Sequence, residues 1–233
     1  MVLPLYLAMT PWEMDGCAAL PPHPGWMACH FDPDGPGLRD LPDALPPGAM
    51  LILNDRFPCR DHDPVRIAAA LARSAERLGC GSVLLDFERE PAADAISVVQ
   101  ALREALPCPL AAPPGFIEDL DCAVFLPPCP LHVPLEDHLR PWQGRAIWLD
   151  LSFRQQTITV TRDGTTYGPA APADRQGGEY DEILRCQCVT ETGPDSISFT
   201  LFDTPETLKR KLEQAAALGV TKGVGLYQEL SRR

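Results

Sequence analysis

Eight short apolar runs recur along the chain, each bounded by Pro, Gly or Asp. Runs of this length are too short for helices and are typical of strands that are buried on both faces. The sequence therefore predicts eight core strands. They are Leu3–Met9, Trp26–Phe31, Ala49–Leu53, Ser82–Phe87, Pro109–Ala112, Cys122–Leu126, Ala146–Leu151 and Gly223–Tyr227.

Helices are predicted between several of these strands. The best-defined one starts after Asp63, with Pro64 at its first position, and stops at Gly79. Two more are expected over Ala93–Leu106 and Pro205–Leu218, because each segment carries an apolar stripe that can face a sheet. Strand followed by helix thus recurs along the chain.

This alternation predicts an α/β fold of the (β/α)8 TIM-barrel type, because repeated strand-helix units build parallel sheets and eight strands close into a barrel. We expect residues 1–233 to form one domain. The connections Pro11–Gly25 and Pro33–Gly48 carry no helical stripe, so the outer helices should be incomplete there. The strands without outer helices must be covered by the chain's own loops or by another subunit. The sequence therefore leaves open whether the chain forms a homo-oligomer.

The segment Thr157–Phe202 breaks the alternation. Its residues favour strands, with one hairpin turning at Asp163-Gly164 and a second strand pair over Ile183–Thr190 and Ser196–Leu201. We interpret it as a small antiparallel β insertion, residues 157–202, before the last helix.

Composition excludes several classes of partner. Against 20 Lys+Arg stand 32 Asp+Glu, a formal charge of −12, and no Lys/Arg run provides the basic patch that nucleic acid requires. No stretch of about 18 apolar residues could cross a membrane. The first 16 residues lack the basic start of a signal peptide.

The nine cysteines are odd in number and irregularly spaced, which is typical of reduced thiols. We therefore expect a cytoplasmic protein. Cys59 with His62, and Cys186 with Cys188, resemble halves of metal sites, but neither pair has partners at ligand spacing. Buried thiols are the expected role, with no metal and no cofactor.

Polar residues gather at the predicted strand ends, where barrels place their active sites. The clearest group follows Leu84, because alternation along a strand puts Leu84, Asp86 and Glu88 on one face. Two such carboxylates beside an apolar layer raise each other's pKa, and one can then serve as a general acid. The alternative is that the strand ends at Phe87 and Glu88 begins a solvated loop.

The stretch GSVLLDFEREP resembles the D-x-x-D-x-D-x-E strand of glycoside hydrolase family 18, the chitinase-like barrels. The C-terminal stretch FTLFDTPETLKRKLEQAAALGVTKGVGLYQEL is similar to the end of those proteins. The resemblance implies that Glu88 is the general acid and that Asp86 orients the N-acetyl group of the substrate. It implies no enzymic nucleophile, since the N-acetyl oxygen attacks the anomeric carbon. Tyr227 then falls at the floor of the sugar subsite.

The motif is only partly kept. Gly81 and Leu84 occupy the positions of its first two aspartates, and Phe125 begins an apolar stretch where the family has a tyrosine and an aspartate. Asp150, at the seventh strand, can substitute in part. Two hypotheses therefore stay open: a hydrolase of β-linked N-acetylglucosamine glycans, or a catalytically inactive barrel that binds a glycan or a protein partner.

Further residues complete the candidate substrate-binding set. Trp12 follows the first strand, where a sugar-stacking side chain would sit, although most tryptophans belong to cores. Asp55 and Gln228 follow other strands at the same end of the predicted barrel. With Tyr227 and Asp150, these residues are expected to contact a carbohydrate ligand.

Overall fold

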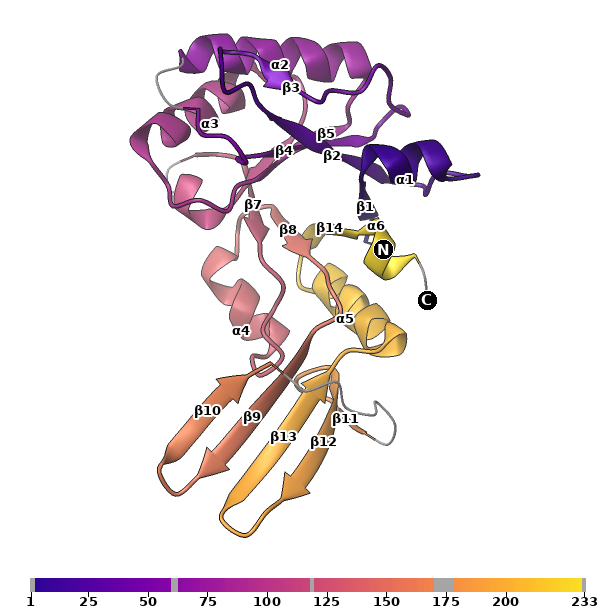
Figure 1. Cartoon of the computed structure of the whole chain (residues 1–233), viewed down its shortest axis with the longest axis vertical. Coiled ribbons are helices and arrows are strands. Elements are labelled where there is room, and N and C mark those ends of the chain that lie inside the picture. The colour runs from indigo at the N-terminus through magenta and orange to yellow at the C-terminus, as the bar shows by residue number, and fades with distance from the viewer. Residues whose placement is uncertain (1–2, 60–62, 118–119, 170–177, 232–233) are drawn as a thin grey trace.

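The computed structural model describes residues 3–59, 63–117, 120–169 and 178–231. Within them, eight parallel strands pair in the order β1, β2, β4, β5, β6, β7, β8, β14 and back to β1, which closes the barrel (Figure 1). The predicted TIM-type barrel is confirmed. Its strands are β1 (Leu5–Met9), β2 (Pro24–Phe31), β4 (Met50–Asn54), β5 (Ser82–Asp86), β6 (Leu110–Ala112), β7 (Ala123–Leu126), β8 (Ile147–Asp150) and β14 (Val220–Leu226).

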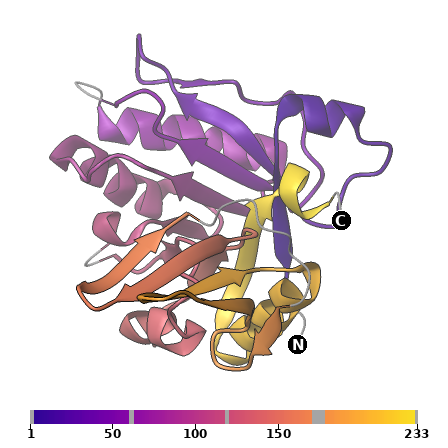
Figure 2. The same ribbon diagram turned by 60° about the horizontal axis from the view of Figure 1, so that its bottom comes forward.

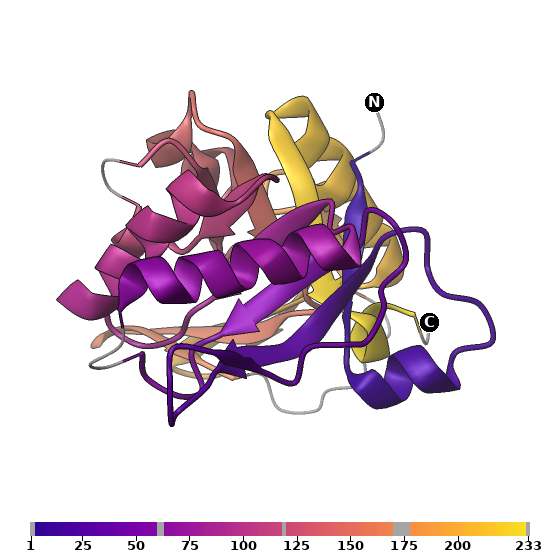
Figure 3. The same cartoon turned by 90° about the horizontal axis from the view of Figure 1, so that it is seen from above.

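Three helices cover part of the outer wall, as predicted. They are α2 (Pro64–Leu78), α3 (Ala93–Ala105) and α5 (Pro205–Ala217). Figure 3 shows α2 and α3 lying side by side along the barrel. The ends of α2 follow the sequence signals, since the Asp63 side chain accepts a hydrogen bond from the backbone of Val65 and Gly79 adopts the left-handed conformation at φ 63°.

Elsewhere the outer layer is thin. The described part of the connection from β6 to β7 holds the turn η1 (Pro114–Phe116), and the connection from β7 to β8 holds the short α4 (Leu135–Leu139) with η2 (Arg140–Trp142). Between β2 and β4 the chain forms only β3 (Leu38–Arg39), which pairs antiparallel with β2.

The loop around β3 covers the wall that lacks a helix. Leu38, Leu41 and Leu45 pack against the outer core, and Trp26 Nε1 donates a hydrogen bond of 2.7 Å to the carbonyl of Asp40. Here the chain's own loop provides the cover that the missing helix would otherwise give.

A short helix, α1 (Pro11–Gly16), interrupts the first connection, where the sequence suggested no helix. Its start is a capping box: the Glu13 carboxylate accepts from the Thr10 backbone at 2.8 Å, and the Thr10 hydroxyl accepts from the Glu13 backbone. The Thr-Pro-Trp-Glu pattern signals this start. With only six residues, α1 is too short for an apolar stripe to reveal it.

The core has two layers. An inner cluster of side chains fills the barrel lumen, and an outer cluster with more residues lies between the strands and the outer helices. The inner layer establishes which strand positions face the lumen. Its buried members are Tyr6, Ala8, Met50, Ile52, Leu84, Ala111, Ala123, Phe125, Trp148 and Val224.

The β insertion is a separate antiparallel sheet among the described residues, in the order β10-β9-β13-β12-β11. Figure 1 shows it projecting from the barrel next to α4 and α5, and Figure 2 brings it forward. The hairpin at Asp163-Gly164 is confirmed. The strands are β9 (Gln155–Thr161), β10 (Gly164–Gly168), β11 (Glu179–Asp181), β12 (Cys186–Thr192) and β13 (Ser196–Phe202).

Strand β12 begins at Cys186, three residues later than expected. The carboxylate of Asp181 accepts hydrogen bonds of 2.9 Å from the backbones of Ile183 and Leu184. Arg185 then takes a positive φ of 56°. These contacts form a tight turn from residues whose β-branched and aliphatic side chains had suggested a strand.

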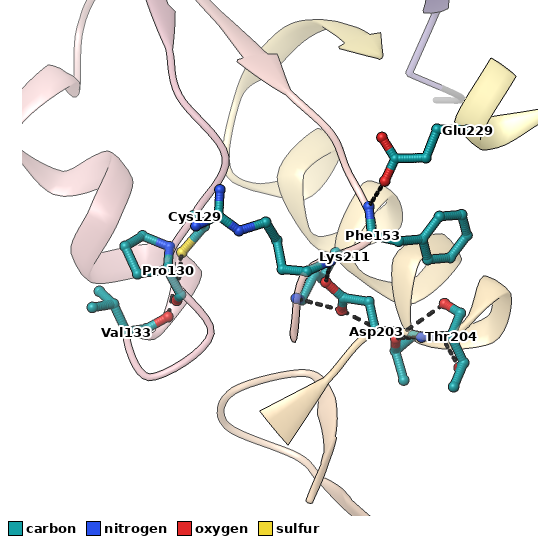
Figure 4. A network of polar contacts seen from close by, with 10 residues as sticks. Cys129, Pro130, Val133, Phe153, Asp203, Thr204, Lys211 and Glu229 are labelled. Atoms are coloured by element: carbon teal, nitrogen blue, oxygen red, sulfur yellow. Dashed lines mark hydrogen bonds and ion pairs between the residues drawn. The ribbon is translucent and has the colours of Figure 1, made fainter. Parts of the chain in front are cut away.

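A buried network fastens the insertion to the barrel (Figure 4). The backbone of Asp203 donates a hydrogen bond of 2.9 Å to the carbonyl of Arg154, and the backbone of Arg154 donates one of 3.2 Å to Oδ2 of the Asp203 carboxylate. The other carboxylate oxygen of Asp203 accepts from Lys211 Nζ at 2.6 Å and from the Thr207 hydroxyl at 3.2 Å. Both charged side chains are largely removed from water.

No helix in the described ranges is long and apolar enough to cross a membrane. All nine cysteines are free thiols. Among the described residues no group of three or more His, Cys, Asp or Glu side chains could hold a metal ion. His62 lies outside the described residues.

Candidate functional site

Polar side chains lie at the carboxyl ends of three barrel strands, β4, β5 and β8. Asp86, Asp150 and Asn54 each stand two residues after a lumen-facing residue of the same strand. Because strand side chains alternate, all three point into the mouth at the carboxyl ends of the strands. Asn54 and Asp86 are also register partners on adjacent strands.

Both aspartates of the mouth have a raised pKa. Burial raises the pKa of Asp86, and the charges of Glu88 and Asp55 raise it further. Burial also raises the pKa of Asp150 from 3.8 to about 6, and its next largest cause is Asp86. Asp150 therefore takes up a proton at about pH 6, well above the range of an ordinary aspartate.

Glu88 lies on the exposed rim, where its charge still raises the pKa of Asp86. Strand β5 ends at Asp86, and Glu88 is exposed in the following loop. The backbone of Glu88 donates to one carboxylate oxygen of Asp55 at 3.1 Å, and that of Arg89 to the other at 2.9 Å. Asp55 thus fixes the loop that carries Glu88.

Tyr227 does not end the last strand, as the sequence suggested, but begins a short helix, α6 (Tyr227–Leu230). The hydroxyl of Tyr227 lies 3.3 Å from Sγ of Cys17, at hydrogen-bond distance. Figures 1 and 3 show α6 beside α1. On α1 the side chain of Trp12 is 87% exposed, and Gln228 is exposed on α6. Both helices follow carboxyl ends of barrel strands.

Glu229 has a structural role that the sequence did not reveal. Its Oε1 accepts a hydrogen bond of 2.6 Å from the backbone of Phe153, as Figure 4 shows. This contact ties α6 to the segment that follows β8. The same carboxylate also contributes to the raised pKa of Asp150.

The structure gives a physical reason for the incomplete motif. A Cβ atom at Gly81 would lie 2.6 Å from the carbonyl oxygen of Gly48, closer than real contacts allow. Leu84 is 1% exposed within the inner core. An acidic side chain at either position would clash or lose its solvation. Among the described residues none donates a hydrogen bond to the Asp86 carboxylate.

Comparison with known proteins reveals similarity in structure alone. No protein-family model matches the chain, and no curated protein matches it by sequence. A class V chitinase from Nicotiana tobaccum has 10% identity and a TM-score of 0.57, over 97% of this chain and 93% of that one. A GH18 chitinase variant from Cycas revoluta, in complex with (GlcNAc)4, has 12% identity and a TM-score of 0.57, over 95% and 94%.

Spore proteins form a second group of similar structures. The spore cortex-lytic enzyme SleL from Bacillus cereus has 10% identity and a TM-score of 0.52, over 96% of this chain and 70% of that one. The resemblance seen in the sequence is therefore confirmed for the fold. The chain has the eight-stranded barrel of the GH18 chitinases and the spore cortex-lytic enzyme SleL.

Proposed function

We propose that this protein hydrolyses β-linked glycans that contain N-acetylglucosamine, by a substrate-assisted mechanism that retains the anomeric configuration. The observation that best supports the proposal is the position of Asp86 and Asp150, two partly buried carboxyl groups that follow the lumen-facing Leu84 and Trp148 in the mouth of a chitinase-type barrel. A neutral carboxylic acid can donate a hydrogen bond to the acetamido group, and a carboxylate can accept one from it.

Each residue has a role in this proposal. Glu88, on the rim, donates a proton to the oxygen of the leaving sugar, and Asp86 orients the acetamido group whose oxygen attacks the anomeric carbon. Asp150 supplies the second polar contact to that group. Asp55 positions Glu88 through the loop backbone. The aromatic faces of Tyr227 and Trp12 stack on sugar rings, beside Gln228.

An inactive barrel that binds a glycan or a protein partner is the second candidate. The exposed position of Glu88 favours it. So does the apolar surround of Asp86, where Leu84 and Phe125 fill the adjoining lumen. Such a surround lacks the oriented donors that stabilise developing charge, each worth about 3 kcal/mol.

Turnover of a fluorogenic chitobiose substrate tests the first candidate. The wild-type chain should release the fluorophore, and Glu88→Gln should lower kcat by about 100-fold or more with little change in KM, because it removes the transferable proton but keeps the shape. Glu90→Gln is the matched control, since Glu90 is exposed in the same loop. Equal rates for wild type and Glu88→Gln would exclude the assigned role.

Calorimetric titration with chitotetraose separates the two candidates. Binding without turnover by the wild type identifies an inactive glycan-binding barrel. Neither binding nor turnover overturns both glycan proposals. A hydrolase should also release the β-anomer first, which proton NMR of the fresh product resolves, because a retaining mechanism preserves the configuration of the bond that is cut.

A further inference from the structure

A cavity of about 880 Å³ opens at the end of the barrel opposite to Asp86 and Asp150. Its walls come from the loops that precede β6, β7 and β8 and from the first half of β14. Trp148 and Lys222 reach it from the lumen. The cavity is therefore separate from the acidic mouth.

Lys222 is the charged group at the inner end of this cavity. Its Nζ lies 4.3 Å from the centre of the Trp148 ring and 4.9 Å from that of Tyr6. Among the described residues none accepts a hydrogen bond from this ammonium group, which carries three donors. Burial lowers the pKa of Lys222 to about 8, so the amine is still mostly protonated at neutral pH.

The rim of the cavity is also cationic. Arg103 lies on it and donates hydrogen bonds to the backbone and carboxylate of Asp121. Arg145 lies nearby and donates to the carbonyls of Ile117 at 3.2 Å and Leu120 at 2.9 Å. Asp121 is the carboxylate of the described wall, and its side chain points into solvent. Three cations thus surround a cavity in a protein of net charge −12.

The rest of the wall that the structure describes adds no negative charge. Burial raises the pKa of the Cys108 and Cys122 thiols, which keeps them neutral at physiological pH. Leu106, Leu110 and Ala123 supply apolar surface beside them. An anion with a nonpolar body would meet a charge partner and an apolar wall in the same cavity.

Lysine is rare in this chain, which makes its place in the lumen informative. The sequence has three lysines, Lys209, Lys211 and Lys222, among 20 basic residues. Lys209 is exposed on α5 and Lys211 is buried against Asp203. Lys222 is the lysine that lines the cavity, and its compact charge on a flexible stem suits a narrow lumen.

We propose that this cavity binds a small molecule that carries a carboxylate or phosphate group on a nonpolar body, with its oxygens held by Lys222 Nζ and its approach favoured by Arg103 and Arg145. The ligand supplies an acceptor for the ammonium group, which has none among the described residues, and the apolar wall contacts the nonpolar body of the ligand. Binding at this end is independent of glycan binding at the mouth.

Competitive labelling of the three lysines tests the proposal on the wild-type chain. Trace acetic anhydride labels amines, and mass spectrometry compares Lys222 with the exposed Lys209. Saturating phenylphosphate or benzoate should slow labelling of Lys222 by about fivefold or more and leave Lys209 unchanged. Inorganic phosphate and acetate, as bare anions, distinguish the contribution of the oxyanion from that of the ring. If none of the four probes protects Lys222, the proposal is wrong.

Calorimetry on variants gives a second measurement. Lys222→Met keeps the stem and removes the charge, so the best probe should bind at least about tenfold more weakly. Lys209→Met is the matched control and should bind like the wild type. Equal affinity for wild type and Lys222→Met would show that the ammonium group fills the end of the barrel lumen without binding the anion. The labelling result stands even where Lys222→Met fails to fold.

Discussion

The ammonium group of Lys211 lies 2.6 Å from Oδ1 of Asp203, and both side chains are almost fully buried. This ion pair joins helix α5 to the residue that follows the last strand of the insertion. The same carboxylate also holds Thr207 and the backbone of Arg154. One acidic side chain thus connects the β sheet, helix α5 and the end of the barrel strand β8.

Removing one partner of this pair should destabilise the protein strongly. We expect Lys211→Met to lower the free energy of unfolding by about 3–5 kcal/mol, because Asp203 is left as an uncompensated buried charge. Urea denaturation measures the loss. Lys209→Met, two residues away on the exposed side of the helix, should change stability by less than about 0.5 kcal/mol. A Lys211→Met variant as stable as this control would show that the pair contributes little.

Asp150 should make the stability depend on pH. Its pKa is about 6 in the folded chain against an ordinary value of 3.8, so between these values the folded chain binds more protons than the unfolded chain. The contribution of Asp150 to stability therefore falls as pH rises from about 4 to 6, and it stays lower above 6.

Asp150→Asn should remove this dependence. Since one pKa unit corresponds to about 1.4 kcal/mol, the variant should be more stable than wild type by up to about 3 kcal/mol at pH 7 and nearly equal to it at pH 4. Chemical denaturation across this range measures both. Asp15→Asn, on the exposed side of α1, should leave the profile unchanged. Parallel profiles for wild type and Asp150→Asn would contradict the assignment.

Gly81 should tolerate no side chain. We expect Gly81→Ala to cost at least about 1–3 kcal/mol, because the new Cβ would lie 2.6 Å from the oxygen and 2.9 Å from the Cα of Gly48, and neither backbone atom can move easily. Thermal unfolding measures the effect. Gly16→Ala is the control, since nothing lies within 4 Å of a Cβ there. Equal melting temperatures for the two variants would refute the close approach.

Trp12 should contribute to glycan binding but not to stability. Because its ring is 87% exposed, Trp12→Ala should leave the melting temperature within about 2 °C of wild type. Loss of a stacking face should weaken chitotetraose binding by about tenfold, and Trp12→Phe should recover part of the affinity. Tryptophan fluorescence titration follows both. Unchanged affinity for Trp12→Ala would remove this residue from the site.

The sequence by itself determined the elements of the fold. Short apolar runs and clear caps are local signals, so the eight barrel strands and the helices after Asp63, Ala92 and Thr204 could be located within a few residues. The hairpin at Asp163-Gly164 followed from turn chemistry in the same way. Alternation also predicted that Asp86 shares a face of its strand with Leu84, which lies in the inner layer.

Only the tertiary structure decided which of these polar groups lie close to one another. Glu88 lies on the rim because β5 ends at Asp86 and the carboxylate of Asp55, 33 residues away, binds the backbone of the next loop. Lys222 faces the lumen because closure of the barrel brings Tyr6 and Trp148 from distant strands around its Nζ. Such contacts depend on side chains far apart in the chain, and no local pattern encodes their distance.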